Sequence, residues 1–178
     1  MERERIYIHE DIVMKVYEYR RDYVTFIDLD PKSWELSKTS LKYHKLKRRP
    51  CIDLIIKFNV CSLVQTIKLL HQPVGSVIGV DTNSRTSLVE IGSAQLNVVE
   101  DYVLVWECYV YQYFRSYAKK VIIALEHFLR DNYPEVRKIY INGYEPSYPN
   151  EYEHYLKELG YELVREVDSV TKVYVKSL

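Results

Sequence analysis

Hydrophobic and polar positions follow the clearest pattern between residues 102 and 178. Residues 102–110 (YVLVWECYV) are apolar at nearly every position, which is typical of a strand buried on both faces in the middle of a sheet. Strict alternation along this strand predicts two faces. Val103, Val105 and Tyr109 are expected on one face, and Leu104, Trp106, Cys108 and Val110 on the other.

The chain after this strand alternates between helix-like and strand-like spacing. Residues 114–129 predict a long amphipathic helix, with an apolar stripe at i, i+3 and i+4 that faces a sheet. A short strand at 138–142 comes next. A second helix follows and ends at Gly160, since glycine commonly occupies the position just past a helix end. Two closing strands at 162–167 and 172–176 are expected to pair antiparallel.

The segment before residue 102 predicts two further strands joined by a polar turn. Gly75 and Gly79 flank β-branched residues, as in a strand with a bulge or a close backbone approach. Residues 81–87 (DTNSRTS) have the composition of a turn, and residues 87–96 resume a strand pattern. Gly-punctuated strands therefore lead into the apolar strand at 102–110.

The first 73 residues carry weaker signals. Residues 5–9 alternate like a strand, Asp11 could cap a helix over 12–24, and Asp30-Pro31 either ends that segment or caps the next one. A second helix is predicted over 34–48, stopped by Pro50. Residues 51–60 fit a strand or a buried helix, and 62–71 favour a helix that Pro73 ends, so the role of segment 51–72 stays open.

Composition narrows the class of protein. A length of 178 residues with 47% apolar and 28% charged residues predicts one domain, spanning residues 1–178, with a real core. No apolar run is long enough to cross a membrane, and the charged start of the chain does not resemble a signal peptide. Three cysteines in apolar runs predict reduced core residues and a cytoplasmic protein. Lysine plus arginine and aspartate plus glutamate both total 25, so no overall charge marks a nucleic-acid binder.

The order of elements from residue 74 to 178 resembles the acyl-CoA-binding half of the GCN5-related N-acetyltransferase family. The resemblance implies an acetyltransferase-like α/β (α+β) fold, a three-layer sandwich with a mixed, mostly antiparallel sheet between helices. Residues 1–73 would then hold the first strand and the substrate-side helices, and residues 74–178 the cofactor half. In that family a central strand splays from its neighbour and offers backbone groups to pantetheine.

The family also carries a pyrophosphate loop at the start of a helix, where free N–H groups favour anions. Here the aligned loop runs from Tyr113 to Ala118. Ala118 matches the last small position, Ser116 replaces the central glycine and Tyr113 replaces a leading glutamine or arginine, while Arg115 could supply charge. Ser116 could equally cap the helix. The resemblance implies a cofactor site of Cys108, Val110, Tyr113, Arg115, Ser116, Tyr117, Ala118 and Asn142, for acetyl-CoA or another acyl-CoA.

The family's second signature is a helix reading Tyr-x-x-x-Gly-Phe, whose tyrosine commonly protonates the departing thiolate. In this chain Leu156 occupies the tyrosine position and Tyr161 the phenylalanine position. Tyr152, one turn earlier, and the adjacent Tyr155 are the possible substitutes. Core packing is the alternative role for these tyrosines. The family's asparagine would correspond to Asn142 or Asn150.

Candidate bases and metal ligands follow from the side chains themselves. Glu107 lies among apolar residues, where desolvation would make its carboxylate a better base, although a glutamate at the rim paired with a lysine or tyrosine fits as well. The backbone N–H of Val110 is the best candidate for an oxyanion or pantetheine contact. The five histidines are scattered without metal-ligand spacing, so no metal is expected. Cys108 favours a core role over that of a nucleophile.

One basic cluster has no acid between Glu35 and Asp53. It could contact the 3′-phosphate of CoA or a nucleic-acid backbone, or form a solvated helix face. Its members are Lys38, Lys42, Lys45, Lys47, Arg48 and Arg49.

The resemblance implies an N-acyltransferase that moves an acyl group from acyl-CoA to an amine of a small molecule or protein within a ternary complex. Glu107 would act as the base, and Tyr152 or Tyr155 as the acid. The alternative is a catalytically inactive acetyltransferase-like module that binds a protein, a ligand or a nucleic acid. No membrane partner is expected, and a homodimer fits the tyrosine-rich composition.

Overall fold

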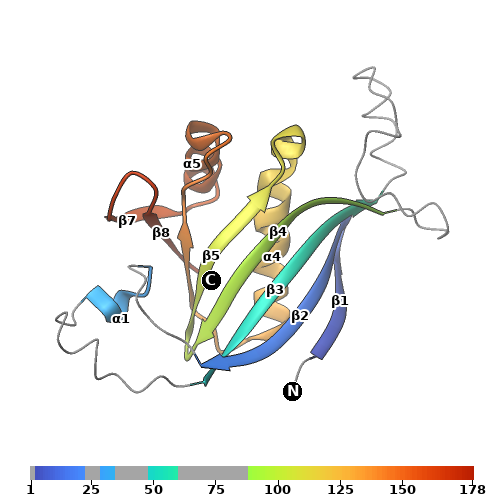
Figure 1. Ribbon diagram of the computed structural model, residues 1–178, viewed down its shortest axis with the longest axis horizontal. Coiled ribbons are helices and arrows are strands. Elements are labelled where there is room, and N and C mark those ends of the chain that lie inside the picture. Colours follow the sequence, from blue (N-terminus) through green and yellow to red (C-terminus); the bar gives the residue numbers. More distant parts are fainter. Residues whose placement is uncertain (1–2, 23–28, 35–47, 60–87) are drawn as a thin grey trace.

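The computed structural model describes residues 3–22, 29–34, 48–59 and 88–178. Within them, eight strands form one sheet in the order β1-β2-β3-β4-β5-β6-β8-β7 (Figure 1). Only the pairing of β5 with β6 is parallel among the described strands, which confirms the predicted mixed, mostly antiparallel sheet. The strands are β1 (Arg3–His9), β2 (Ile12–Asp22), β3 (Arg48–Asn59), β4 (Leu88–Val99), β5 (Tyr102–Val110), β6 (Lys138–Asn142), β7 (Glu162–Glu166) and β8 (Lys172–Ser177).

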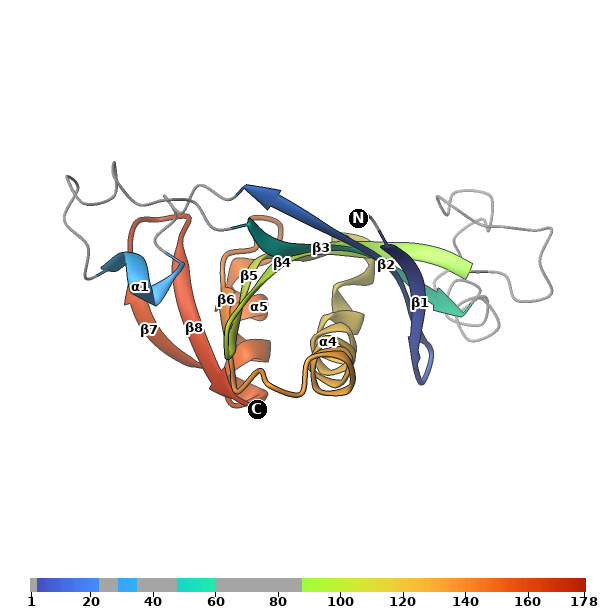
Figure 2. The same ribbon diagram turned by 90° about the horizontal axis from the view of Figure 1, so that it is seen from below.

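Two longer helices cover the concave face of the sheet (Figure 2). Helix α4 (Ala118–Asn132) buries a stripe that includes Val121, Leu125 and Phe128 against the strands, as its apolar spacing predicts. Helix α5 (Pro149–Glu158) adds Tyr152 and Leu156 to the same core. Gly160 follows the end of α5 with φ of +90°, the left-handed conformation predicted for it.

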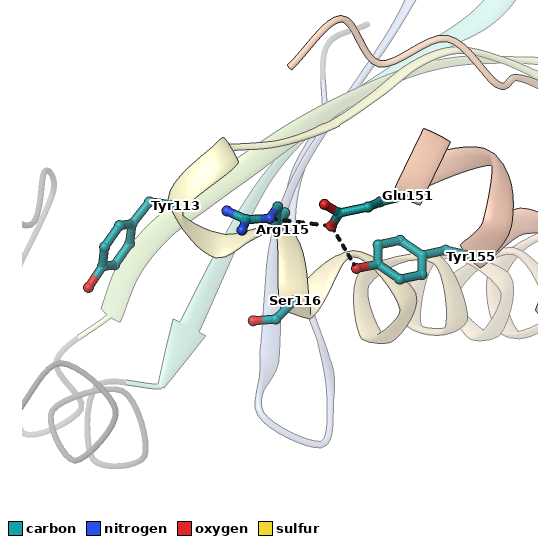
Figure 3. Close-up of a pocket in the computed structure, with 5 residues that line it drawn as sticks. All are labelled: Tyr113, Arg115, Ser116, Glu151 and Tyr155. Carbon is teal, nitrogen blue, oxygen red and sulfur yellow. Dashed lines mark hydrogen bonds and ion pairs between the residues drawn. The ribbon is translucent and has the colours of Figure 1, made fainter. Parts of the chain in front are cut away.

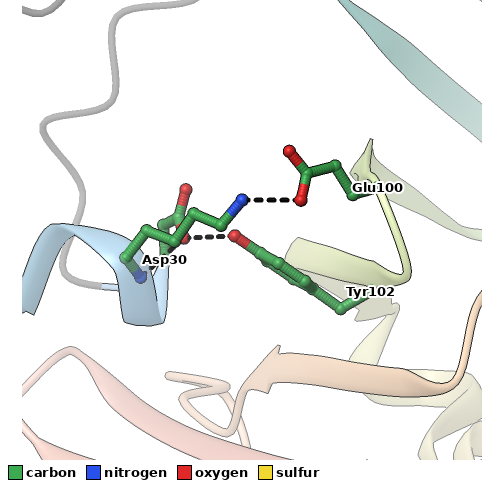
Figure 4. A network of polar contacts seen from close by, with 4 residues as sticks. Asp30, Glu100 and Tyr102 are labelled. Carbon is green, nitrogen blue, oxygen red and sulfur yellow. Dashed lines mark hydrogen bonds and ion pairs between the residues drawn. The ribbon is translucent and has the colours of Figure 1, made fainter.

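The opposite face carries the four-residue helix α1 (Pro31–Trp34) (Figure 2). Asp30 caps this helix, since its carboxylate Oδ1 accepts the Lys32 N–H at 3.0 Å and the buried Tyr102 hydroxyl at 2.7 Å (Figure 4). Lys32 Nζ also reaches Glu100 at 2.9 Å. These contacts fix α1 to β5 beside a small apolar cluster that contains Leu29 and Leu104.

The helix predicted over residues 12–24 is wrong, because this segment forms the strand β2. Ile12, Met14 and Val16 alternate onto the buried face, and this period of two outweighs the partial helical spacing of the same segment. Residues 51–59 likewise belong to strand β3, so Pro50 lies within a strand rather than at a helix end. Predictions over residues 35–47 and 60–87, which include Gly75, Gly79 and most of the basic cluster, lie outside the described residues.

Strand β5 contains a bulge that strict alternation does not predict. Gln95 on β4 pairs with Glu107, but Leu96 pairs with Val105, so Trp106 is an extra residue. The bulge changes the face that each later side chain occupies. Cys108 and Val110 join Val103 and Val105 in the core, and Tyr109 does not, which corrects the two predicted faces.

The parallel pairing of β5 and β6 stops early. It runs from Tyr102 with Lys138 to Val105 with Ile141, whereas β5 continues to Val110. Residues 106–110 of β5 therefore extend past the pairing with β6, which itself ends at Asn142. The candidate site lies near this unpaired end of β5.

Candidate functional site

Two pockets lie near the end of β5. The first, here called the acidic pocket, has a volume of about 360 Å³ and contains residues from the β5 bulge and from the loop after β6. Its walls are formed by Gln95, Trp106, Glu107, Cys108, Tyr109, Asn142, Tyr144, Glu145 and Pro146. The structure thus brings three predicted site residues together here, namely Glu107, Cys108 and Asn142.

The second pocket, here called the arginine pocket, has a volume of about 480 Å³. It lies between the 3-10 helix η2 (Gln112–Tyr117) and the first half of α5 (Figure 3). Its walls are formed by Tyr113, Arg115, Ser116, Glu151 and Tyr155, and four of these five were predicted from the sequence. Glu151 was missed because nothing in the helix sequence indicates what its carboxylate faces.

The charge in the arginine pocket is already paired. Glu151 Oε2 lies 3.3 Å from Arg115 Nε and accepts the Tyr155 hydroxyl at 3.3 Å (Figure 3). Arg115 also donates to the backbone oxygen of Gln112 at 3.2 Å. Both members of the ion pair are about half exposed, so the pair is weak and can open. An anion that entered this pocket would compete with Glu151 for Arg115.

Two aromatic residues of the aligned loop, Phe114 and Tyr117, do not line this pocket. Phe114 is buried in the core, and Tyr117 packs against Phe58 with ring centroids 4.6 Å apart. The Ala118 N–H donates to the Arg115 carbonyl, so this amide is used within the helical turn. Ser116 does not occupy the N-cap position of η2 or α4, which removes the capping role considered for it.

Val110 is the last residue of β5, in the part of the strand that does not pair with β6. The next residue, Tyr111, donates its N–H to Ile91 O of β4 at 2.9 Å. Because polar groups alternate along a strand, the N–H and carbonyl of Val110 point to the opposite edge. The Val110 carbonyl there accepts the hydroxyl of buried Tyr148 at 2.6 Å. Burial raises the pKa of Tyr148 well above its ordinary value, with the nearby Glu145 carboxylate adding to the rise.

Tyr152 lies in the core behind β5 and lines neither pocket. Its hydroxyl has no hydrogen bond of normal geometry within the described residues, but the Cys108 thiol is near enough that each group affects the pKa of the other. Burial raises the pKa of the Cys108 thiol to about 12, so this thiol is not a nucleophile. Tyr155, which lies one residue and about 100° from the buried Leu156, reaches the arginine pocket instead.

Glu107 is exposed, so the desolvation expected for it is wrong. The bulge at Trp106 turns its side chain out of the core. Glu145, which the sequence analysis missed, has the property expected of Glu107. It is 2% exposed, and burial raises the pKa of its carboxyl, while the Ser147 N–H, which donates to Oε1 at 3.0 Å, opposes this rise.

The remaining candidate asparagines have different surroundings. The side-chain oxygen of Asn142 accepts the backbone N–H groups of Tyr144 at 3.2 Å and Lys172 at 3.3 Å, which shapes the loop that carries Glu145. Asn150 is exposed in the first turn of α5.

In the described part of the chain, no group of three His, Cys, Asp or Glu side chains could hold a metal ion. None of the described helices is long and apolar enough to span a bilayer. Cys51 and Cys108 are buried free thiols, and Cys61 lies outside the described residues.

No protein-family model and no curated protein matches the sequence. Among solved structures, the chain is similar to a domain from Methanocaldococcus jannaschii, with a TM-score of 0.47 and 12% identity over 93% of this chain and 99% of that one. It is similar to an acetyltransferase from Bacillus cereus, with a TM-score of 0.41 and 14% identity over 67% and 89% of the two chains.

A third similar structure is the PaiA N-acetyltransferase from Thermoplasma acidophilum in complex with coenzyme A, with a TM-score of 0.41 and 10% identity. This match covers 51% of the present chain and spans about half, 55%, of that protein. Acetyltransferases are therefore among the structures that the chain resembles, as the order of its elements predicted. At TM-scores below 0.5 these similarities say nothing about what the chain binds.

Proposed function

We propose that this protein is an acyl-CoA-dependent N-acyltransferase, a divergent relative of the GCN5-related family. The observation that carries the proposal is the end of the β5–β6 pairing at Val105, with two pockets near the unpaired end of β5. An extended ligand in this gap would meet backbone groups of β5, a basic side chain at one end and carboxylates at the other.

The arginine pocket fits the phosphates of a CoA donor. It offers Arg115 and the Ser116 hydroxyl, and Phe114 and Tyr117 do not line it. We assign the phosphate contacts to Tyr113, Arg115 and Ser116, with the buried Ala118 at the start of the following helix. Cys108, Val110, Tyr117 and Asn142 would lie along the rest of the cofactor. When bound, an acyl-CoA would supply the acyl group as a thioester, which is already activated for transfer.

The acidic pocket would receive the amine that accepts the acyl group. An ammonium group must lose its proton before its nitrogen can attack, and the Glu107 carboxylate lines the pocket with access to solvent. The Val110 N–H would donate to the oxygen that becomes negatively charged. Tyr155 and Tyr152 are the proposed proton donors. Tyr155 lines the arginine pocket, to which the phosphates are assigned, whereas Tyr152 would act only if the core around Cys108 opened.

Isothermal titration with acetyl-CoA, followed by mass detection of acetylated amines, tests the proposal. We expect CoA to bind the wild type and to bind Arg115→Ala at least about tenfold more weakly, because a charge-assisted contact is lost. Arg165→Ala, which removes a positive charge far from the pocket, is the matched control. The absence of CoA binding at millimolar concentration would refute the proposal.

A non-catalytic binding module is the second candidate, and one set of contacts favours it. Arg115 is held by Glu151, the Val110 carbonyl is held by Tyr148, and Leu156 stands where the family has its tyrosine. A chain that binds CoA yet acetylates no amine would support this candidate. Loss of salt-sensitive nucleic-acid binding on replacing Lys45, Arg48 and Arg49 would support its nucleic-acid form.

A further inference from the structure

The acidic pocket contains two carboxylates that no cation among the described residues neutralises. Its walls include Glu107 and Glu145 but no lysine, arginine or histidine. Among the described residues, neither glutamate forms an ion pair, and only Ser147 donates hydrogen bonds to the Glu145 carboxylate. The other carboxylates near the site do have cations, since Glu151 pairs with Arg115 and Glu158 with Lys119.

Because Glu145 is buried, the lack of a cation beside it among the described residues indicates what kind of ligand would bind there. Its side chain is 2% exposed, and a carboxylate removed from water is unfavourable unless a positive group compensates it. The loop holds Glu145 in this place, because the Ser147 N–H binds Oε1 and Asn142 fixes the turn before it. A ligand that brings its own positive charge would supply what the protein lacks.

The aromatic walls of the same pocket suit a cation as well. Trp106, Tyr109 and Tyr144 line it, and aromatic faces attract ammonium groups at short range. Its volume of about 360 Å³ lies near the lower end for small-molecule sites, which favours a compact ligand.

We propose that the acceptor substrate is a small diamine, with one nitrogen positioned for acylation and the other retained as an ammonium ion bound by Glu145. This inference rests on the proposed function for the transfer step, but the recognition of the ammonium ion does not. The reacting nitrogen must be neutral to attack, so only the second nitrogen can keep its charge and pair with a carboxylate. Glu107, which is exposed, remains available to take the proton from the first nitrogen.

Three compounds of similar length test the recognition directly. They are 1,4-diaminobutane, n-butylamine and 4-aminobutanoate, which share one primary amine and differ in the charge at the other end. Calorimetry without CoA should show that the diamine binds at least about tenfold more tightly than butylamine, and that the amino acid binds least. Equal affinities for the three compounds would overturn the proposal.

Two variants assign the effect to Glu145. Glu145→Gln keeps the acceptor for the Ser147 N–H and removes the charge, so it should lose the preference for the diamine over butylamine. Glu135→Gln removes an exposed carboxylate outside both pockets and should retain the preference. If Glu145→Gln did not fold, Glu107→Gln should still bind the diamine in preference to butylamine, because the second ammonium ion pairs with Glu145. A preference unchanged in Glu145→Gln, or lost in Glu107→Gln alone, would overturn the proposal.

The acyltransferase proposal and the diamine proposal can be refuted separately. Diamine binding without CoA binding would retain the ammonium site and refute the acyltransferase. Transfer from acetyl-CoA to butylamine and diaminobutane with equal kcat/KM would retain the acyltransferase and refute the diamine.

Discussion

The acidic pocket and the arginine pocket both contain glutamates, but these glutamates differ in burial and in ion pairing. In the arginine pocket, Glu151 is about half exposed and lies 3.3 Å from Arg115. In the acidic pocket, Glu145 is buried and has no cationic partner among the described residues. The arginine pocket therefore neutralises the Glu151 carboxylate with Arg115, whereas neutralising the Glu145 carboxylate in the acidic pocket would require a bound cation.

This difference indicates how each pocket would bind. A cation entering the acidic pocket meets carboxylates that are already available. An anion entering the arginine pocket must first displace Glu151, which reduces its affinity by the strength of that ion pair. The two pockets thus differ in charge, with uncompensated carboxylates beside the β5 bulge and a paired arginine beside η2.

The largest effect is expected where both pockets depend on one strand contact. A Cβ on Gly92 would lie 2.1 Å from the Tyr109 carbonyl oxygen of β5, a clash with backbone that no rotamer relieves. We expect Gly92→Ala to lower the free energy of unfolding by about 3 kcal/mol in urea titrations and to weaken both pockets together. Ser93→Ala, at the next position, should change stability by less than about 0.5 kcal/mol. Equal stability of the two variants would contradict the close approach of β4 and β5.

A smaller loss of stability is expected from removing the hydrogen bond between Tyr148 and the end of β5. Tyr148→Phe removes the hydroxyl that donates to the Val110 carbonyl at 2.6 Å and leaves a buried acceptor unpaired. The free energy of unfolding should fall by roughly 1–2 kcal/mol, as measured by thermal denaturation. Tyr144→Phe serves as the control, since its hydroxyl makes no hydrogen bond to a described residue. A loss as large in Tyr144→Phe would show that the Val110 contact is not what stabilises this region.

Removing the competitor in the arginine pocket should strengthen anion binding. Glu151→Gln frees Arg115, and because exposed ion pairs are worth up to about 1 kcal/mol, CoA should bind up to about fivefold more tightly. Glu158→Gln changes the net charge equally on the same helix but lies outside the pocket, so it should have less effect. Weaker binding of CoA by Glu151→Gln in calorimetry would mean that Glu151 holds Arg115 in a productive position.

The smallest effect concerns pH. The pKa of Glu145 is raised in the folded state by burial, so the protein prefers its protonated form. The stability that this neutral form gives is present below the ordinary glutamate pKa of 4.5 and is lost as the pH rises through the raised value. At pH 7, Glu145→Gln should therefore be more stable than the wild type, by under about 1 kcal/mol because the pocket is open to solvent. This gain should vanish in denaturation curves below pH 4.5. A gain that persisted there would contradict the titration of Glu145.

Much of the C-terminal half could be predicted from the sequence because its elements are long and regular. The stripe along α4 and the glycine after α5 have one interpretation each, and both are confirmed. Strand β2 was harder, because its residues fit both periods. The signal that decides it is the turn before it, where Glu10 adopts φ of 52° between paired His9 and Ile12.

A similar Glu-Asp turn recurs between β4 and β5, where Glu100 has φ of 54°. Neither turn contains the glycine or asparagine that usually marks such a hairpin, so the pattern of residue types did not reveal it. The residue types around Trp106 do not indicate the bulge there either, yet this bulge makes the Glu107 side chain face outward. Glu145 and Glu151 were missed because their roles depend on what approaches them across the gap, and local spacing carries no such information.

Mapping two ligands onto one protein tests the central claim most directly. Amide chemical shifts should be recorded by NMR during separate titrations with acetyl-CoA and with 1,4-diaminobutane. We expect acetyl-CoA to shift residues 112–118 and 149–155, and the diamine to shift residues 106–109 and 142–147. Ligands that perturb the same residues, or that leave both sets unchanged, would contradict a site divided between an anion pocket and a cation pocket.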